Sequence, residues 1–120
     1  MPGITIAEAA RQTGISAHTL RYYERIGLLD RVARDGDRRR FDHDDLARVE
    51  FLRCLRATGM PIRRMREYVE LVRRGPTTND ERRRLLEEHR DAVLVELDRL
   101  QRELTVIEKK ITMYHGGPNG

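Results

Sequence analysis

The apolar residues of the C-terminal part recur at alternating steps of four and three between residues 93 and 114. This spacing is the heptad repeat of a coiled-coil helix. The sequence predicts no second long helix that would cover the repeat within one chain, so the pattern predicts a homodimer. It leaves open whether the paired helices run parallel or antiparallel. We expect the dimer interface to consist of Val93, Leu97, Leu100, Leu104, Ile107, Ile111 and Tyr114.

The helix that carries this repeat is predicted to begin at Thr78-Asn79-Asp80-Glu81, which has the pattern of a capping box. Neither Gly nor Pro interrupts the chain from there to Gly116. Residues 80 to 114 would then extend about 50 Å at 1.5 Å per residue. The glycine-rich residues 116–120 are predicted to be a flexible tail.

The N-terminal part shows shorter apolar patterns separated by helix-ending residues. Thr5 and Glu8 form a second predicted capping box, and the helix that follows is predicted to stop at Gly14. Ser16 is predicted to cap another helix, which ends at Gly27. Two short helices around a glycine turn are typical of a helix-turn-helix, whose second helix enters the major groove of DNA.

A turn at residues 35–37 and three consecutive arginines come next, and Phe41 follows them. We interpret Arg38, Arg39 and Arg40 as part of a β-hairpin wing, with Phe41 anchoring its return to the core. Like charges in a row repel one another unless they are solvated or face an anion. A flexible basic loop is the alternative interpretation.

Two further helices are predicted after the wing. Asp42 caps the first, which extends to about residue 58, and Pro61 opens the second. Arginines in the first turns of the second helix, beginning with Arg63, could form a second wing against the DNA backbone. Gly75 and Pro76 end this helix.

Tyr22 and Tyr23 are adjacent on the second predicted helix and are flanked by Arg21 and Arg25. Neighbouring helical positions point about 100° apart, so the two rings cannot share one apolar face. Arginine beside exposed tyrosine favours contact with phosphates and a DNA groove. The alternative is that one tyrosine packs inward while the other lies on the surface.

The charge distribution agrees with a nucleic-acid partner for the first part. Residues 1–75 hold 16 Arg against 11 acidic residues, whereas residues 76–120 hold 8 basic and 9 acidic residues. Excess positive charge on one part is expected where that part meets phosphate. With 38% hydrophobic against 37% charged residues, we expect some apolar surface to be shared with a second copy.

Several classes of protein are not indicated. No apolar run reaches the roughly 20 residues of a membrane span, and the single Cys54 excludes an intrachain disulfide. We therefore expect a cytoplasmic, nucleoid-associated protein without membrane contact. No nucleophile–base pair or Gly-rich phosphate loop predicts an enzyme, and no cofactor is expected. The histidines show no ligand spacing and predict no metal site; they are His18, His43, His89 and His115.

The order of these parts resembles the MerR family of bacterial transcription regulators. The most specific segment is Thr19-Leu20-Arg21-Tyr22-Tyr23-Glu24-Arg25-Ile26-Gly27-Leu28-Leu29. Other matching segments are Thr5-Ile6-Ala7-Glu8-Ala9-Ala10, Gly14-Ile15-Ser16, Arg39-Arg40-Phe41, Asp45-Leu46 and Leu55-Arg56-Ala57-Thr58-Gly59-Met60. The resemblance covers nearly the whole chain.

The resemblance implies a mainly α protein with a winged helix-turn-helix domain (1–75), a dimerisation helix (76–115) and a tail (116–120). The dimer would form through an antiparallel coiled coil. It would bind a dyad operator in an over-long promoter spacer of double-stranded DNA, and distort that DNA. RNA polymerase would respond indirectly, through the promoter.

The resemblance also implies roles for single residues. His18, Thr19, Arg21 and Tyr22 would meet the major groove and its phosphates, and Tyr23, Arg39 and Arg40 would contact the backbone. The complete set of expected DNA-binding residues is Thr5, Ser16, His18, Thr19, Arg21, Tyr22, Tyr23, Arg38, Arg39, Arg40 and Arg63. Two positions depart from the family pattern: Phe41 replaces a common tyrosine, and Pro61 replaces a frequent capping serine.

Few residues follow Tyr114, so we expect a short form without an effector domain. The segment around Cys54 is similar to the aldehyde- and thiol-stress-responsive branch of the family, which makes Cys54 a sensor candidate. A thiolate there could be alkylated or oxidised. The alternative is a small apolar residue packed in its helix. An architectural or constitutive DNA-binding protein without small-molecule sensing is the alternative function, and a pure coiled-coil adaptor is a further one.

Overall fold

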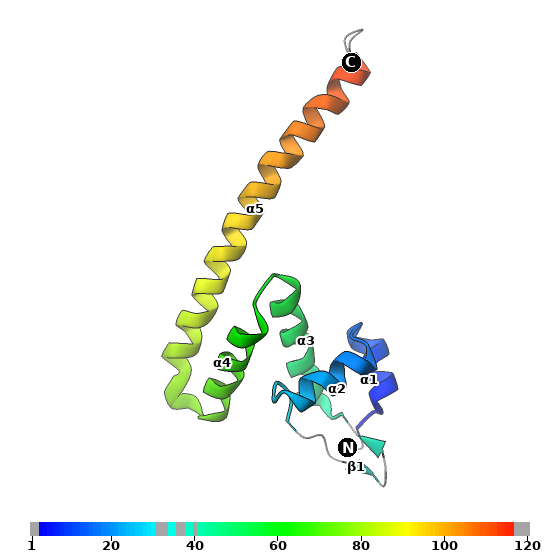
Figure 1. Cartoon of the computed structure of the whole chain (residues 1–120), viewed down its shortest axis with the longest axis vertical. Helices are drawn as coiled ribbons and strands as arrows, with labels where there is room; N and C mark the ends of the chain where they lie inside the picture. The colour runs from blue at the N-terminus through cyan, green and yellow to red at the C-terminus, as the bar shows by residue number, and fades with distance from the viewer. Residues whose placement is uncertain (1–2, 31–33, 36–37, 40, 117–120) are drawn as a thin grey trace. The chain divides into compact units, whose positions relative to one another are not determined.

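A computed structural model describes residues 3–30, 34–35, 38–39 and 41–116 of the chain. The elements in chain order are α1 (Ile6–Thr13), α2 (Ala17–Arg25), β1 (Arg34–Asp35), β2 (Arg38–Arg39), α3 (His43–Ala57), α4 (Ile62–Arg73), the 3-10 helix η1 (Pro76–Thr78) and α5 (Asn79–Gly116). They form two compact units, Met1–Arg82 and Arg83–Gly120. The predicted architecture of helix-turn-helix, small hairpin and long C-terminal helix is confirmed (Figure 1).

The predicted capping residues set the ends of α1 and α2. The Thr5 hydroxyl accepts the Glu8 amide at 3.2 Å, and the Thr5 amide donates to the Glu8 carboxylate at 3.4 Å, so the capping box is present. Gly14 ends α1 with φ of 75°, a left-handed conformation that glycine adopts without steric cost. Ser16 then caps α2 by accepting the Thr19 amide at 3.1 Å.

Helices α2 and α3 end in the same way. In each, a glycine with positive φ follows the last turn, and the amide after it returns to a carbonyl inside the helix. Leu28 donates to the Tyr23 carbonyl at 2.8 Å, and Met60 donates to the Leu55 carbonyl at 2.9 Å. Leu28 and Met60 are both buried, so each helix end also places an apolar side chain in the core.

The core of the first unit lies between α1, α2, α3 and α4 and is closed by the base of the hairpin. There, Ile4 and Phe41 exchange two backbone hydrogen bonds of 2.8 Å. The Phe41 ring is buried, as predicted for the hairpin anchor. A Cβ at Gly3 would lie 2.4 Å from the Phe41 carbonyl oxygen, so this close approach requires glycine. Buried apolar residues of the core are Ala9, Ile15, Leu20, Tyr23, Leu28, Leu29, Phe41, Val49, Leu52, Leu55, Met60, Met65, Val69 and Leu71.

The junction of α4 and α5 differs from the prediction. Thr78 lies in η1, and its buried hydroxyl donates to the carbonyl of Leu71 at 2.6 Å and shares that donation with the Gly75 carbonyl at 2.8 Å. Arg82 donates to the same hydroxyl at 2.9 Å and to the Gly75 carbonyl at 2.7 Å. The predicted Thr78–Glu81 capping box is therefore wrong: the hydroxyl serves the end of α4 instead of the start of α5. Arg82 thus adds a charged donor to the carbonyls at and just after the C-terminal end of α4, where a cation is favourable.

Asp30 links the segment after α2 to two other helices of the first unit. Its carboxylate accepts Nε and Nη2 of Arg73, on α4, at 3.1 and 2.8 Å. Arg48, on α3, lies 3.6 Å from the other carboxylate oxygen. The Asp30 side chain is 62% exposed, so the network contributes modestly to stability and mainly fixes relative positions.

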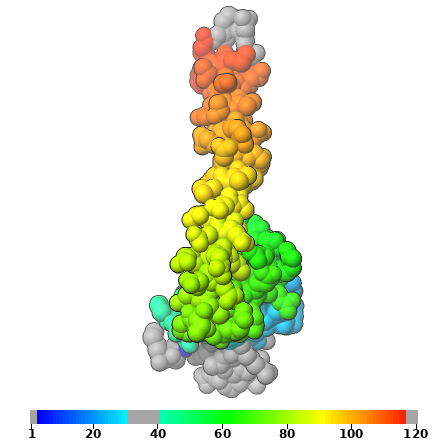
Figure 2. Space-filling view, turned by 90° about the vertical axis from the view of Figure 1, so that its left-hand side faces the viewer, coloured from blue at the N-terminus to red at the C-terminus, as the bar shows by residue number. Residues whose placement is uncertain are grey.

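The second unit is a single helical segment, and most of its predicted seam is uncovered in one copy of the chain. Val93 is partly buried, but from Leu97 to Tyr114 each seam residue exposes between 46% and 69% of its surface. The yellow-to-red side chains in Figure 2 show one face of this segment. Its side-chain ion pairs are local, as between Arg102 and Asp98 at 3.1 Å. Such an exposed apolar stripe is typical of a helix that pairs with another helix.

Candidate nucleic-acid interface

Helix α2 has one buried face and one exposed face, and the exposed face carries the polar residues expected to meet DNA. Leu20 and Tyr23 point into the core. Three exposed residues follow the exposed His18 by three, four and seven positions, which places all four on one side of the helix. They are Arg21, Tyr22 and Arg25. This side offers two guanidinium groups, an imidazole and a phenol, all suited to phosphate or base edges.

The tyrosine pair divides between the two faces. Tyr22 is 38% exposed and Tyr23 only 5%, although their rings lie 6.1 Å apart. Burial raises the pKa of Tyr23, while the nearby Arg56 charge lowers it less strongly. The packing therefore matches the alternative interpretation of the sequence, in which one tyrosine, here Tyr23, packs inward while the other lies on the surface. Burial leaves Tyr23 little surface to offer a phosphate, and its predicted backbone contact stays a prediction.

Arg25 lies against Tyr22 on the exposed face. Its guanidinium carbon is 5.8 Å from the centroid of the Tyr22 ring, within the range of a cation–π contact. Such a contact restricts a long, flexible side chain to one region of the surface. Arg25 was not among the predicted DNA-binding residues, although its position three residues after Tyr22 already places both side chains on one side of the helix.

The predicted hydroxyl contacts belong to residues that already cap helices. The Thr5 hydroxyl donates to the Glu8 carboxylate at 2.9 Å, and the Ser16 hydroxyl donates to the Thr19 hydroxyl at 3.0 Å. Their protons are thus engaged within the protein, although each oxygen keeps acceptor capacity. DNA contacts from Thr5, Ser16 and Thr19 remain predictions, and the role that the structure shows for Thr5 and Ser16 is to cap the N-termini of α1 and α2.

The wing and α4 complete the predicted set. β1 and β2 are antiparallel, with Arg34 paired with Arg39 and Asp35 with Arg38. Arg40 and the side chains of Arg38 and Arg39 lie outside the described residues. Arg63 is exposed in the first turn of α4, and Pro61 at its N-cap makes no side-chain cap. The structure thus places Arg63 at the surface, as a second-wing residue requires.

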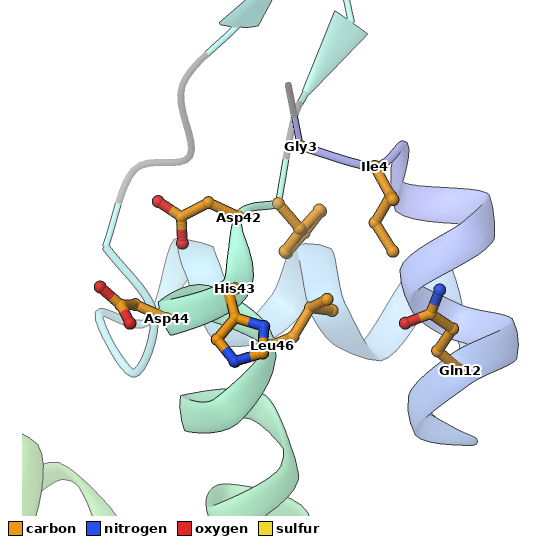
Figure 3. A pocket seen from close by; sticks show the side chains of 8 residues that line it. Gly3, Ile4, Gln12, Asp42, His43, Asp44 and Leu46 are labelled. Atoms are coloured by element: carbon orange, nitrogen blue, oxygen red, sulfur yellow. The ribbon is translucent and has the colours of Figure 1, made fainter. Parts of the chain in front are cut away.

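A cavity of about 470 Å³ lies between the base of the hairpin, α1 and the start of α3 (Figure 3). His43 and Asp44 of α3 line it together with the N-cap residue Asp42, opposite Gln12 of α1. Asp42 accepts the Asp45 amide at 2.8 Å, and this hydrogen bond is the main cause of the lowered pKa of Asp42. Carboxylates at this cavity repel phosphate, so it is not a suitable site for DNA.

Cys54 is exposed on α3, and so it is not the packed apolar residue of the alternative interpretation. Glu50, one turn earlier, is paired with Arg53 at 3.3 Å. The Cys54 carbonyl accepts the Thr58 hydroxyl at 2.8 Å, which holds the last turn of α3. The thiol is therefore accessible to a reagent in a single copy of the chain.

In the part of the chain that the structure describes, none of the helices combines the length and the hydrophobicity of a membrane-spanning segment. Within the same ranges, no three His, Cys, Asp or Glu side chains gather as metal ligands would.

Two family descriptions match the chain over overlapping ranges. "MerR HTH family regulatory protein" matches residues 4–71, and "MerR, DNA binding" matches residues 46–113. The first range covers more than half of the chain and contains the helix-turn-helix, the hairpin and nearly all of α4. The second continues along α5.

Individual proteins give the same result. An uncharacterized HTH-type transcriptional regulator of Haemophilus influenzae is 39% identical over 111 residues, which are 92% of this chain and 82% of that protein. The regulator AdhR of Bacillus subtilis is 38% identical over 92 residues, or 76% of this chain and 66% of AdhR.

Solved structures agree in fold as well as in sequence. A MerR family transcriptional regulator from Listeria monocytogenes has a TM-score of 0.88 and 35% identity, covering 95% of this chain and 87% of its own. HiNmlR, a MerR family regulator lacking the sensor domain and crystallised with promoter DNA, has a TM-score of 0.84 and 38% identity, covering 96% and 91%. The chain therefore belongs to the MerR family of helix-turn-helix transcription regulators, which are DNA-binding proteins and not enzymes.

Proposed function

We propose that this chain acts as a homodimer that binds a dyad operator within a promoter spacer and distorts that DNA to control transcription. The observation that carries the proposal is the polar face of α2, on which Arg21 and Tyr22 stand exposed while Tyr23 and Leu20 hold the helix to the core. Its similarity to HiNmlR, which was crystallised on promoter DNA, supports the same role. RNA polymerase would be affected through the geometry of the promoter.

The dimer part of the proposal rests on the exposed seam of α5. Six large side chains of the seam, from Leu97 to Tyr114, are about half exposed or more in one copy. Pairing two copies would bury them at about 25 cal/mol per Å² of apolar surface. We propose the antiparallel arrangement, in agreement with the family resemblance. Two DNA-binding units related by a two-fold axis would then match a dyad operator.

The test is direct. Duplexes selected from a random pool by the wild-type protein supply the operator, and footprinting defines its symmetry. In vitro transcription from a promoter that carries the operator then measures control. Arg21→Gln should reduce operator affinity about tenfold or more, because it removes a charged contact. Arg90→Gln is the matched control, since Arg90 is an exposed arginine of α5 paired with Asp91. Failure of the wild type to bind any duplex would refute the proposal.

The architectural alternative uses the same interface with a different outcome. It predicts operator binding and footprints but no change in transcript when the protein is added. A coiled-coil adaptor predicts weak DNA affinity that is insensitive to salt, whereas binding dominated by phosphate contacts weakens steeply as salt rises. Transcription and salt dependence together separate the three functions.

We further propose that Cys54 senses aldehydes, electrophiles or thiol stress. Its exposure on α3 supports the proposal, because a reagent can reach the sulfur. Alkylation would add bulk and polarity to the outer face of α3. The test compares operator-dependent transcription with and without an electrophile in the wild type and in Cys54→Ser. A response that is lost only in Cys54→Ser supports sensing, and equal behaviour of the two proteins contradicts it.

A further inference from the structure

We infer that Arg25 is an additional DNA-contacting residue, which binds a backbone phosphate at the C-terminal end of α2 from a position fixed by the Tyr22 ring. This inference rests on the proposed function and extends it. Arg25 occupies the last turn of α2, on the same exposed face as His18, Arg21 and Tyr22. A helix whose exposed face lies in a groove brings its end toward the backbone that borders the groove.

The electrostatic surroundings of Arg25 support this role. Some exposed arginines are paired with carboxylates, such as Arg53 with Glu50 and Arg99 with Glu96. Among the described residues, the Arg25 guanidinium has no hydrogen-bonded or ion-paired partner, and its contact is with an aromatic ring. Its five N–H donors are therefore available to an anion, and the uncompensated charge favours phosphate.

Tyr22 supplies the positioning. The guanidinium carbon lies 5.8 Å from the ring centroid, and the ring is itself supported by Tyr23 at 6.1 Å. Because Tyr23 is buried in the core, it supports the Tyr22 ring, and the Tyr22 ring in turn contacts Arg25. A side chain held in place before binding loses less conformational freedom when it meets its ligand. Tyr22 thus acts as a positioning residue for Arg25, whatever contact its own hydroxyl makes.

The first experiment measures salt-dependent binding of the full-length wild type, Arg25→Gln, Arg25→Lys and Arg90→Gln to the selected operator and to a random duplex of equal length. A phosphate contact predicts that Arg25→Gln weakens binding to both duplexes about tenfold. It also predicts that the slope of log affinity against log salt becomes shallower by about 0.9 for each protomer. Arg25→Lys should keep the slope, because it keeps the charge. Arg90→Gln removes one charge from α5 and should change neither quantity appreciably.

The second experiment is a double-mutant cycle with Tyr22→Phe and Tyr22→Leu. Phenylalanine keeps the ring, so Arg25→Gln should cost as much affinity in that background as in the wild type. Leucine removes the ring, so Arg25→Gln should cost several-fold less there. Equal costs in all three backgrounds would overturn the positioning role of Tyr22.

Two results would overturn the phosphate contact itself: an unchanged salt slope in Arg25→Gln, or weaker binding to the operator alone. Arg25 also lies where a cation stabilises the end of a helix, so a purely structural role must be tested. That role predicts a lower melting temperature for Arg25→Gln with an unchanged salt slope. If the wild type binds no duplex, the proposed function fails and this inference fails with it. If the wild type binds the operator and Arg25→Gln binds with the same affinity and salt slope, the proposed function stands and only this inference fails.

Discussion

The first unit buries its large side chains, whereas α5 exposes most of its own. In Met1–Arg82, the largest core residues include Phe41, Leu20 and Met65, each at most 1% exposed. Along α5, the seam leucines Leu97 and Leu100 are more than half exposed. The first unit therefore contains its own stabilising contacts, and α5 lacks them in one copy. The stability of the first unit is therefore intramolecular, whereas in the proposed homodimer the order of α5 would depend on protein concentration.

Breaking the seam should have the largest effect. Leu104→Glu would place a carboxylate in the apolar dimer interface of both copies, and we expect dimerisation to weaken by about 4 kcal/mol or more. Sedimentation at several concentrations measures the association. Val106→Glu is the matched control, because Val106 is 66% exposed and lies two residues away, on another side of the helix. Equal loss of dimer in both variants would mean that the seam is misassigned.

Replacing the two adjacent tyrosines singly should give the next largest effect. Tyr23→Ala removes a buried ring from the first unit and should lower its free energy of unfolding by about 3 kcal/mol. Tyr22→Ala removes an exposed ring and should change that free energy by less than about 0.5 kcal/mol while weakening DNA binding. Chemical denaturation at fixed protein concentration measures the free energy of unfolding of both variants. Similar losses of stability would contradict the division of the pair between core and surface.

The junction of α4 and α5 should be intermediate in importance. Arg82→Gln removes the charged donor to the Gly75 carbonyl and should cost about 1 to 2 kcal/mol of stability. Arg83→Gln alters the next residue, whose ion pair with Glu87 is exposed, and should cost about 0.5 kcal/mol or less. Thermal melting distinguishes the two. If the neighbouring variants melt together, the cap on α4 is not a significant contributor.

The Asp30 network should have a smaller effect on stability. Asp30→Asn weakens the contacts to Arg73 and Arg48 and should cost about 0.5 to 1 kcal/mol, because all three side chains are partly solvated. The loss should shrink as salt rises, since exposed charges are screened. Melting temperatures at low and high salt check this expectation. A salt-independent loss would indicate packing and not ion pairing.

A last, small effect should appear in alkali. The pKa of Tyr23 is raised by burial, so its neutral form stabilises the fold. That stabilisation is complete below the ordinary tyrosine pKa of about 10 and is lost as pH rises through the higher folded value. Absorbance titration of tyrosinate should show one late-titrating group in the wild type. Its presence in Tyr23→Phe would assign the late group to another tyrosine.

Local signals made much of the fold predictable. Thr5 and Ser16 cap helices as expected, because an N-cap hydroxyl meets amides only two or three residues away. Phe41 anchors the hairpin because a large apolar residue after a basic run has one favourable place, the core. These contacts are decided within a few residues, where sequence spacing and spatial distance agree.

Non-local contacts were not predictable in the same way. Thr78 has the capping pattern, but carbonyls of α4 and the guanidinium of Arg82 compete for its hydroxyl. Asp30 pairs with Arg73, which is 43 positions away. Which of the two tyrosines is buried could not be predicted either, because a tyrosine can pack in the core or lie on the surface of a helix. At the interface, the motif identifies α2, while the structure decides which side chains are exposed.

The hydrogen bonds made by Thr78 and Arg82 have a consequence for dividing this protein into portable parts. The pattern of glycine and proline at residues 75 and 76 marks an obvious place to cut the chain. A fragment ending there would lose the donors that serve the Leu71 and Gly75 carbonyls. A fragment that keeps the chain through Arg82 retains them and coincides with the first compact unit. The first turn of α5 therefore folds as part of the first unit, Met1–Arg82, which also contains the helix-turn-helix.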